Sequence, residues 1–256
     1  MLRRGLKRDL LILLGALADE FENQSVRYQL WRISTLENYK SSTFYSTISN
    51  LLSVGEIEKI EKKGEVFYQI TSRGSERLKE SIPVFKLAKK VWDGYWRIVI
   101  FDIKGKNRVA RDILRKKLFS LGFGRWQKSV YITPHNIEQE INQYLESHKL
   151  RNYCICLVAK RSDMGDDKLL AEKVWQLEKL NEEYEELIFD CQKLEKEKFG
   201  IEKLSKIWER YKELILKDPH LPKQLLPEGW KAQEAKKKVY NLYTTINDRI
   251  PFYKNE

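Results

Sequence analysis

The clearest pattern of apolar and polar positions in the 256-residue chain lies between Ser41 and Gly74. Within residues 41–54, apolar side chains recur at the spacing of one helix face, at Phe44, Ile48, Leu51 and Leu52. The opposite face of this predicted helix carries hydrogen-bonding side chains and no acid: Ser42, Thr43, Tyr45, Ser46, Ser49 and Asn50. Gly55 follows, and we expect it to end the helix as a left-handed residue.

Two strands with alternating apolar and polar residues follow this helix. Residues 56–62 and 65–71 flank the dipeptide Lys63-Gly64, which is typical of a hairpin turn. The sequence Thr71-Ser-Arg-Gly74 then closes the second strand and begins another helix. A helix with a polar outer face, followed by a hairpin with a basic tip, is the arrangement of a winged helix-turn-helix domain. Such domains usually read duplex DNA.

Further helices complete this N-terminal block. An apolar stripe predicts the first helix, at Leu10, Leu13, Leu14, Leu17 and Phe21. A shorter helix is predicted near residues 26–33, and a helix over residues 73–82 leads out of the block and ends at Pro83. We therefore expect a winged-helix DNA-binding domain over residues 1–90.

The next block, residues 91–162, combines strands and helices. A run of β-branched and aromatic residues from Tyr95 to Ile103 predicts a buried strand, and further strands are expected at 127–133 and 153–159. Helices are expected over residues 107–121 and 137–145. The first should turn Val109, Ile113, Leu114, Leu118 and Leu121 inward and Arg108, Arg111, Arg115, Lys116 and Lys117 outward. If residues 123–133 fold as a hairpin, the order is that of a ferredoxin-like domain; a simpler strand-helix-strand-helix-strand sheet fits the same pattern.

The last block, residues 163–256, is predicted to be a helical domain, so the fold class of the chain is α+β. A long charged helix is expected from about residue 168, with a break at Phe199-Gly200, and two more helices over 201–216 and 232–247. The long helix suits either a coiled-coil seam or a helical hairpin, and we favour the hairpin. Aromatic residues at helical spacing are expected in the core rather than in an effector pocket: Trp175, Tyr184, Trp208, Tyr211, Tyr240 and Tyr243.

Charge is unevenly distributed along the chain. Residues 1–90 hold 16 basic and 11 acidic side chains, residues 91–162 hold 14 and 6, and residues 163–256 hold 18 and 20. The net charges are therefore +5, +8 and −2, and the first two blocks carry the positive field that attracts a polyanion. No apolar run reaches a membrane-spanning length, and three irregularly spaced cysteines fit a reducing cytoplasm.

Three stretches of the chain resemble the PaaX family of bacterial repressors, named for phenylacetic acid catabolism. They are Asp218-Pro-His-Leu-Pro-Lys-Gln-Leu-Leu-Pro-Glu-Gly-Trp230, Trp96-Arg-Ile-Val-Ile-Phe-Asp102-Ile, and Leu121-Gly-Phe-Gly124 with the following Gln127-Lys-Ser-Val-Tyr-Ile. With the winged helix in first position, the resemblance spans essentially the whole chain. It implies a homodimeric transcription factor with a winged helix, a ferredoxin-like centre and a helical C-terminal domain. It also implies a small-molecule effector, which for the family's namesake is an acyl-CoA.

Asp102 is the sharpest enzymatic candidate. The central block is also similar to small CRISPR-associated endonucleases of the ferredoxin-like fold, which hold a metal-binding aspartate at this position. Two such carboxylates in a dimer could hold Mg²⁺ for phosphodiester hydrolysis. Alternatively, Asp102 pairs with Arg108 or Arg111 or caps the next helix. Its neighbours, Lys104-Gly-Lys106-Asn107, supply no second acid, so the metal site would be poor.

Cysteines and histidines suggest no other chemistry. Cys154 and Cys156 share one face of a predicted strand. A metal site would need more ligands than these two cysteines and His148. We expect these cysteines and Cys191 in the core. The histidines lie near no nucleophile motif.

The sequence thus predicts a cytoplasmic, homodimeric, sequence-specific DNA-binding repressor that is not an enzyme and holds no cofactor or metal. The alternatives are a Mg²⁺-dependent nuclease that uses Asp102 and a non-DNA adaptor. Polar residues of the predicted recognition helix should meet base edges, and lysines should bind phosphates. The expected DNA contacts are Lys40, Ser41, Ser42, Thr43, Tyr45, Ser46, Ser49, Asn50, Lys62 and Lys63.

Overall fold

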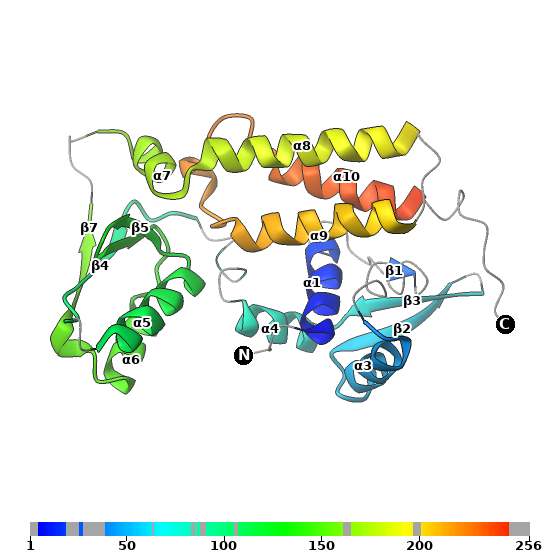
Figure 1. Ribbon diagram of the computed structural model, residues 1–256, viewed down its shortest axis with the longest axis horizontal. Helices are drawn as coiled ribbons and strands as arrows, with labels where there is room; N and C mark the ends of the chain where they lie inside the picture. Colours follow the sequence, from blue (N-terminus) through cyan, green and yellow to red (C-terminus); the bar gives the residue numbers. More distant parts are fainter. Residues whose placement is uncertain are drawn as a thin grey trace. The chain divides into compact units, whose positions relative to one another are not determined.

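The computed structural model of the chain describes residues 5–18, 26–27, 39–62, 64–82, 85, 87, 91–104, 107–160, 165–196 and 201–245. It mixes helices and strands, which confirms the predicted α+β class (Figure 1). The chain divides into two compact units, one of Met1–Ser81, Asn181–Lys217 and Lys231–Glu256 and one of Ile82–Leu180 and Asp218–Trp230. The predicted domain boundaries near residues 90 and 162 stay predictions. The predicted positions Phe21, Pro83 and Phe199-Gly200 lie outside the described residues.

The N-terminal part of the first unit holds three described helices and a small antiparallel sheet. The helices are α1 (Leu6–Ala18), α3 (Ser41–Ser53) and α4 (Ser72–Ser81). The strands are β1 (Val26–Arg27), β2 (Ile57–Lys62) and β3 (Glu65–Ile70), in the order β1-β3-β2. Strands β2 and β3 form the predicted hairpin, with Lys62 opposite Glu65. As its periodicity predicts, α3 buries Phe44, Ile48 and Leu51.

One predicted helix of this block is wrong at its start. Val26 and Arg27 form a strand, with Val26 opposite Tyr68 of β3, so the predicted helix over 26–33 does not begin there. Pairing with a distant strand has overridden the local preference of a short segment. The remainder, residues 28–33, lies outside the described residues.

The chain turns sharply between α3 and β2, and the first turn of α4 closes this corner. Gly55 has a φ of 66°, and the N–H of Glu56 donates to the carbonyl of Leu51 at 2.9 Å, which confirms the left-handed helix end. A Cβ on Gly74 would lie 2.0 Å from the carbonyl oxygen of Glu56. Thr71 ties the two sides together, because its hydroxyl donates to the carbonyl of Gly55 at 2.6 Å.

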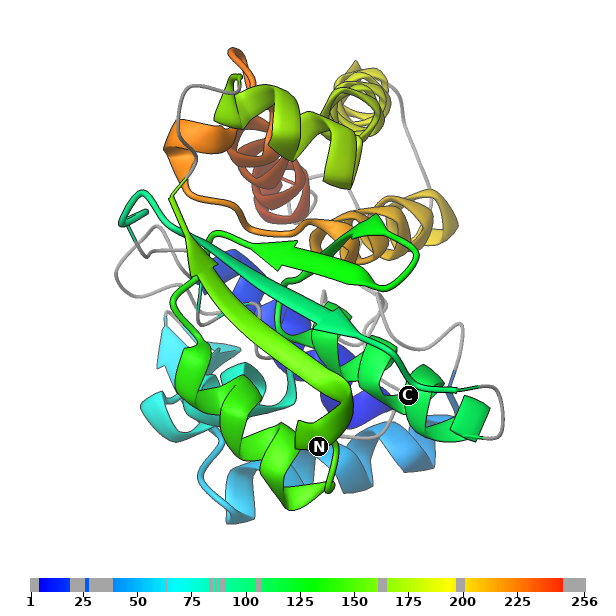
Figure 2. The same cartoon turned by 90° about the vertical axis from the view of Figure 1, so that its left-hand side faces the viewer.

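The second unit contains a four-stranded antiparallel sheet. Its strands are β4 (Trp96–Phe101), β5 (Gly124–Gln127), β6 (Val130–Thr133) and β7 (Cys154–Ala159), in the order β5-β6-β4-β7. Helix α5 (Arg108–Ser120) follows β4, and α6 (Glu138–Ser147) follows β6 (Figure 2). This β-α-β-β-α-β order is that of a ferredoxin-like domain. The pairing of β5 with β6 excludes the simpler sheet.

The exposed face of α5 differs from the prediction. Val109 and Ile113, expected inward, are 73% and 49% exposed, whereas Leu114 is buried as expected. Arg115, expected to be exposed, is instead half-buried, and its guanidinium lies 3.5 Å from the carbonyl oxygen of Lys128. The buried face of α5 is therefore narrower than predicted and consists of Leu114 and Leu118.

The helical block begins with a break that the sequence did not reveal. Helix α7 (Asp167–Trp175) ends at Gln176, whose φ of 53° interrupts the single long helix predicted from residue 168. Helix α8 (Leu177–Lys196) then starts afresh. The carboxylate of Glu172 accepts a hydrogen bond from the N–H of Glu178 at 2.9 Å, which satisfies an N–H at the start of α8.

The remaining helices are α9 (Ile201–Lys217) and α10 (Ala232–Thr245). Ion pairs show that α8 and α9 run antiparallel: Glu183 contacts Lys217 at 2.6 Å, and Asp190 contacts Arg210 at 2.5 Å. Early residues of α8 therefore meet late residues of α9. This arrangement confirms the helical hairpin rather than a coiled-coil seam.

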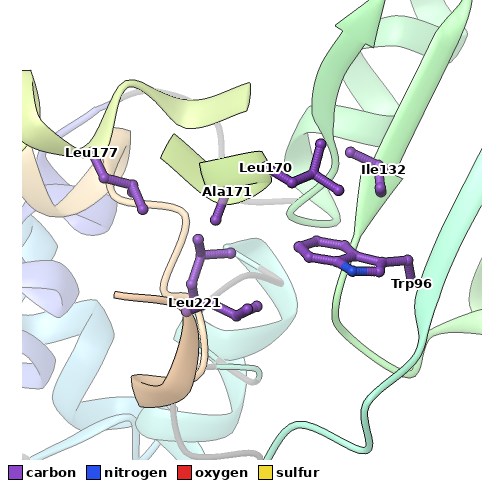
Figure 3. Close-up of a cluster of buried hydrophobic side chains, with 7 residues drawn as sticks. Trp96, Ile132, Leu170, Ala171, Leu177 and Leu221 are labelled. Carbon is purple, nitrogen blue, oxygen red and sulfur yellow. The ribbon is translucent and has the colours of Figure 1, made fainter. Parts of the chain in front are cut away.

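Four of the six aromatic residues predicted for the core of the helical block are buried, whereas Trp175 and Tyr240 are only partly buried. In the first unit, Tyr184, Trp208, Tyr211 and Tyr243 are at most 2% exposed. In the second, Trp96 packs with Ile132 of β6 and with residues of α7, of the start of α8 and of segment 218–230 (Figure 3): Leu170, Ala171, Leu177, Leu221 and Leu225. Within the described residues, no helix combines the length and apolar character needed to cross a bilayer.

Candidate nucleic-acid interface

The outer face of α3 brings the predicted contact residues together. All those on the helix are exposed: Ser41, Ser42, Thr43, Tyr45, Ser46, Ser49 and Asn50. Four exposed serines form a stripe along the middle of this face, because spacings of four, three and four residues place side chains in line on a helix. This serine stripe consists of Ser42, Ser46, Ser49 and Ser53. The sequence prediction omitted Ser53, although the same spacing would have found it.

Some hydroxyls of this face are bound to the backbone of α3. Ser46 donates to the carbonyl of Thr43 at 3.0 Å, and Ser53 donates to the carbonyl of Asn50 at 2.9 Å. A hydroxyl that donates inward keeps lone pairs that accept hydrogen bonds from outside. Tyr45, which is 49% exposed, stands at one side of the stripe. The face therefore offers short acceptors with one aromatic side chain beside them.

The start of α3 suits an anion. Lys40 occupies the N-cap position, is exposed, and makes no side-chain hydrogen bond to the first turn. The first turn contains no acid. Helix N-termini present N–H groups and a partial positive charge, and a neighbouring ammonium adds to the attraction for a phosphate.

Asn50, at the other end of α3, has a partner from α1. Lys7 Nζ donates to Asn50 Oδ1 at 3.4 Å and lies 3.1 Å from Glu56 Oε2. The side chain of Glu56 is only 9% exposed, so the ammonium neutralises a nearly buried carboxylate. Sequence reasoning missed Lys7, since nothing in a local pattern links residues 7 and 50.

The structure does not describe the side chains of the two lysines predicted at the hairpin tip. Lys62 is the last residue of β2, and its side chain lies outside the described part of the structure, as does all of Lys63. Their roles stay predictions.

Asp102 follows β4 and is exposed, with its backbone N–H donating to the carbonyl of Tyr153 at 2.9 Å. Among the described residues, no group of three or more His, Cys, Asp and Glu side chains could hold a metal ion. Arg108, one suggested partner of Asp102, lies 3.8 Å from Asp112. Asp102 therefore lacks the companions that a magnesium site needs in the part of the chain that is described.

The cysteines lie in environments that suppress their reactivity. Cys191 is buried as expected, whereas Cys154 and Cys156 on β7 are only half-buried rather than in the core. Burial nevertheless raises the pKa of the Cys154 thiol to about 11. Burial also raises the pKa of Cys156, and it raises that of the buried Cys191 to about 12. Thiols with such raised pKa values stay protonated at neutral pH and are poor nucleophiles and metal ligands.

Comparisons with known proteins agree with the residue patterns. Residues 89–171 match the family model of the PaaX protein central Cas2-like domain, and residues 175–253 match that of the PaaX-like protein C-terminal domain. The transcriptional repressor PaaX of Escherichia coli (strain K12) is 24% identical over 197 residues, which cover 70% of this chain and 61% of that repressor.

A solved structure shares the fold. The uncharacterized protein Rv0674 from Mycobacterium tuberculosis superposes with a TM-score of 0.57 and is 19% identical, over 93% of this chain and 95% of that one. The two domain models together match more than half of the chain, in the order central then C-terminal. The chain therefore belongs to the PaaX family, which includes a transcriptional repressor.

Proposed function

We propose that this protein is a sequence-specific DNA-binding transcriptional repressor without catalytic activity, and that its N-terminal block is a winged helix-turn-helix domain. The observation that carries the proposal is the exposed, acid-free outer face of α3 next to the β2–β3 hairpin. Membership of the PaaX family supports it, since one relative is a transcriptional repressor.

In this proposal, α3 enters the major groove of DNA, which is about 12 Å wide and admits a helix. The serine stripe meets base edges or phosphates, and Asn50 recognises a base through its amide. Small side chains let the helix backbone approach the groove closely. The face has no arginine, the residue that most often specifies guanine, so DNA shape should contribute to sequence choice.

Phosphates flank the groove, and lysines are proposed to bind them. Lys40 and the first turn of α3 bind one strand, while Lys62 and Lys63 at the hairpin tip bind the backbone nearby. These contacts supply affinity that falls with salt and carry no sequence information.

We also propose that the repressor is a homodimer joined through one face of the β4–β7 sheet. Ile100 of β4 is 37% exposed, and Ile155 and Leu157 of β7 are 60% and 45% exposed. Ile100 lies opposite Ile155, and residues directly opposite share a face, so the three side chains form one patch with Ile98, the partner of Leu157. Strand β7 is at the edge of its sheet, where a second copy has access. Two-fold symmetry would match a palindromic operator.

Release from DNA is assigned to a small-molecule effector, and acyl-CoA is the class that the family resemblance suggests. Titration of an acyl-CoA into the protein–DNA complex tests this part separately. Loss of the complex at micromolar concentrations supports it, whereas a complex that persists at saturating ligand overturns it.

The main test is a gel-shift assay with DNA from upstream of the chain's own gene, with and without Mg²⁺. Salt-sensitive, sequence-selective binding without cleavage supports the repressor. Cleavage that requires Mg²⁺ and is lost in Asp102→Ala supports the nuclease instead. No binding to any DNA supports an adaptor.

A further inference from the structure

Asp9 in α1 contacts two other segments of the first unit. The hydroxyl of Tyr39 donates to Asp9 Oδ2 at 3.3 Å, and the ammonium of Lys212 lies 3.3 Å from the same oxygen. Tyr39 is two residues before Ser41, where α3 begins, and Lys212 belongs to α9. One carboxylate oxygen thus joins the approach to α3 to the C-terminal helices.

The contact is shielded from solvent. The Lys212 side chain is 12% exposed, and that of Asp9 is 22% exposed. Lys212 has a second partner in Glu209, at 2.6 Å. A charge pair in such surroundings is screened less than one at the surface, and removal of one partner leaves the other poorly compensated. Burial and the nearby Asp9 raise the pKa of Tyr39, which keeps its hydroxyl protonated as a donor.

Helix α1, which carries Asp9, is held in place by its buried apolar side chains. Its central residues Leu10 to Leu14 are at most 1% exposed, and the helix packs against α3, α4, β3 and α10 (Figure 1). Lys7, two residues before Asp9, reaches Asn50 at the far end of α3. The first turns of α1 therefore hold α3 close to both of its ends.

We infer that Asp9 is a positioning residue through which α9 of the C-terminal helices fixes the start of α3. Lys212 holds the Asp9 carboxylate, and that carboxylate holds Tyr39, which sets where Lys40 and the first turn of α3 lie. A displacement of α9 that withdraws Lys212 loosens the approach to α3 without touching DNA. The consequence for DNA rests on the proposed function, whereas the contact itself does not.

The first experiment measures hydrogen exchange of the α3 amides, residues 41–53, in the free full-length chain. The variants are Asp9→Asn, Lys212→Met and Tyr39→Phe, which removes only the hydroxyl. The control is Lys217→Met, which breaks the pair of another α9 lysine with Glu183. We expect α3 amides to exchange at least about five-fold faster in the three variants, in line with typical coupling between sites, and at the wild-type rate in the control.

The second experiment measures affinity for operator and random DNA in the same variants and in the Asp9→Asn, Lys212→Met double variant. Each single change should weaken operator binding at least about five-fold, and the double change should weaken it no further, because both act through one contact. Affinity for random DNA should fall as well, because the phosphate contacts of Lys40 and the first turn of α3 serve every sequence. Unchanged α3 exchange, or additive losses, overturns the inference. If the wild-type chain binds no DNA, the proposed function fails and the exchange rates alone decide on Asp9.

Discussion

Lys7 of α1 donates a hydrogen bond to Asn50 of α3, with 3.4 Å between Nζ and Oδ1. Because an ammonium only donates, the contact requires the amide oxygen of Asn50 on the side of Lys7 and leaves its NH₂ group as a donor. A free NH₂ suits an acceptor such as purine N7 in the major groove. The contact thus orients the exposed amide of α3 in the free chain.

Asn50→Ala should therefore reduce the ratio of operator to random affinity by roughly ten-fold, a typical value for one base contact. Fluorescence anisotropy titrations on both DNAs measure the ratio. Lys7→Met is the companion variant, and it should lower the ratio in the same direction but less, because the amide remains and only its orientation is lost. Unchanged discrimination in Asn50→Ala would remove the role proposed for this residue.

Lys40→Ala should weaken binding to operator and random DNA alike. A lysine that contacts phosphate releases a counterion, so its loss lowers the slope of log affinity against log salt by about 0.9. The matched control is Lys168→Ala, at an exposed lysine of α7. A loss confined to the operator would contradict a phosphate contact.

Gly74→Ala should destabilise the fold by about 3 kcal/mol, since steric overpacking of a rigid contact costs this much. The new Cβ would lie 2.0 Å from the carbonyl oxygen of Glu56, a backbone atom that also accepts the N–H of Thr71 at 3.2 Å. Urea unfolding followed by circular dichroism measures the change. Gly5→Ala is the control, because nothing lies within 4 Å of a Cβ there. Equal effects of the two substitutions would show that the Glu56 carbonyl moves to accommodate the new Cβ.

Local sequence patterns predicted the structure correctly where the periodicity of a single element determines it. Phe44, Ile48 and Leu51 are buried on one side of α3, and the hairpin pairs across the Lys63-Gly64 dipeptide as predicted. The exposed part of the candidate interface follows directly, because residues opposite a buried stripe face outward.

Distant partners decided the elements that were predicted wrongly. Val26 is a strand residue because Tyr68 lies opposite it. The burial of Ile113 depends on what covers α5, and the left-handed Gln176 divides a segment whose periodicity continues on both sides. Within the candidate site, Lys7 and Asn50 are separated by 43 positions, so no local pattern reveals their contact.

The thiols should be slow to alkylate in the native chain. Burial raises the pKa of Cys154 from 9.0 to about 11. At pH 8 its thiolate fraction, and hence its reaction rate with iodoacetamide, should be roughly 100-fold below that of the unfolded chain. Mass spectrometry of the labelled peptides, with and without urea, gives the rate for each cysteine. Equal rates in both states would contradict the burial that argues against a metal or redox role.

Leu157→Lys should convert the proposed dimer to a monomer. It places an ammonium on the apolar patch of Ile100, Ile155 and Leu157, where a second copy would have to bury it without a partner. Sedimentation velocity over a range of concentrations measures the state. Val91→Lys is the control, since Val91 is 81% exposed and lies outside the sheet. If the variant stays dimeric, the sheet face is not the interface. If it becomes monomeric, affinity for a palindromic operator should fall while affinity for a half-site stays, because each copy keeps its own α3.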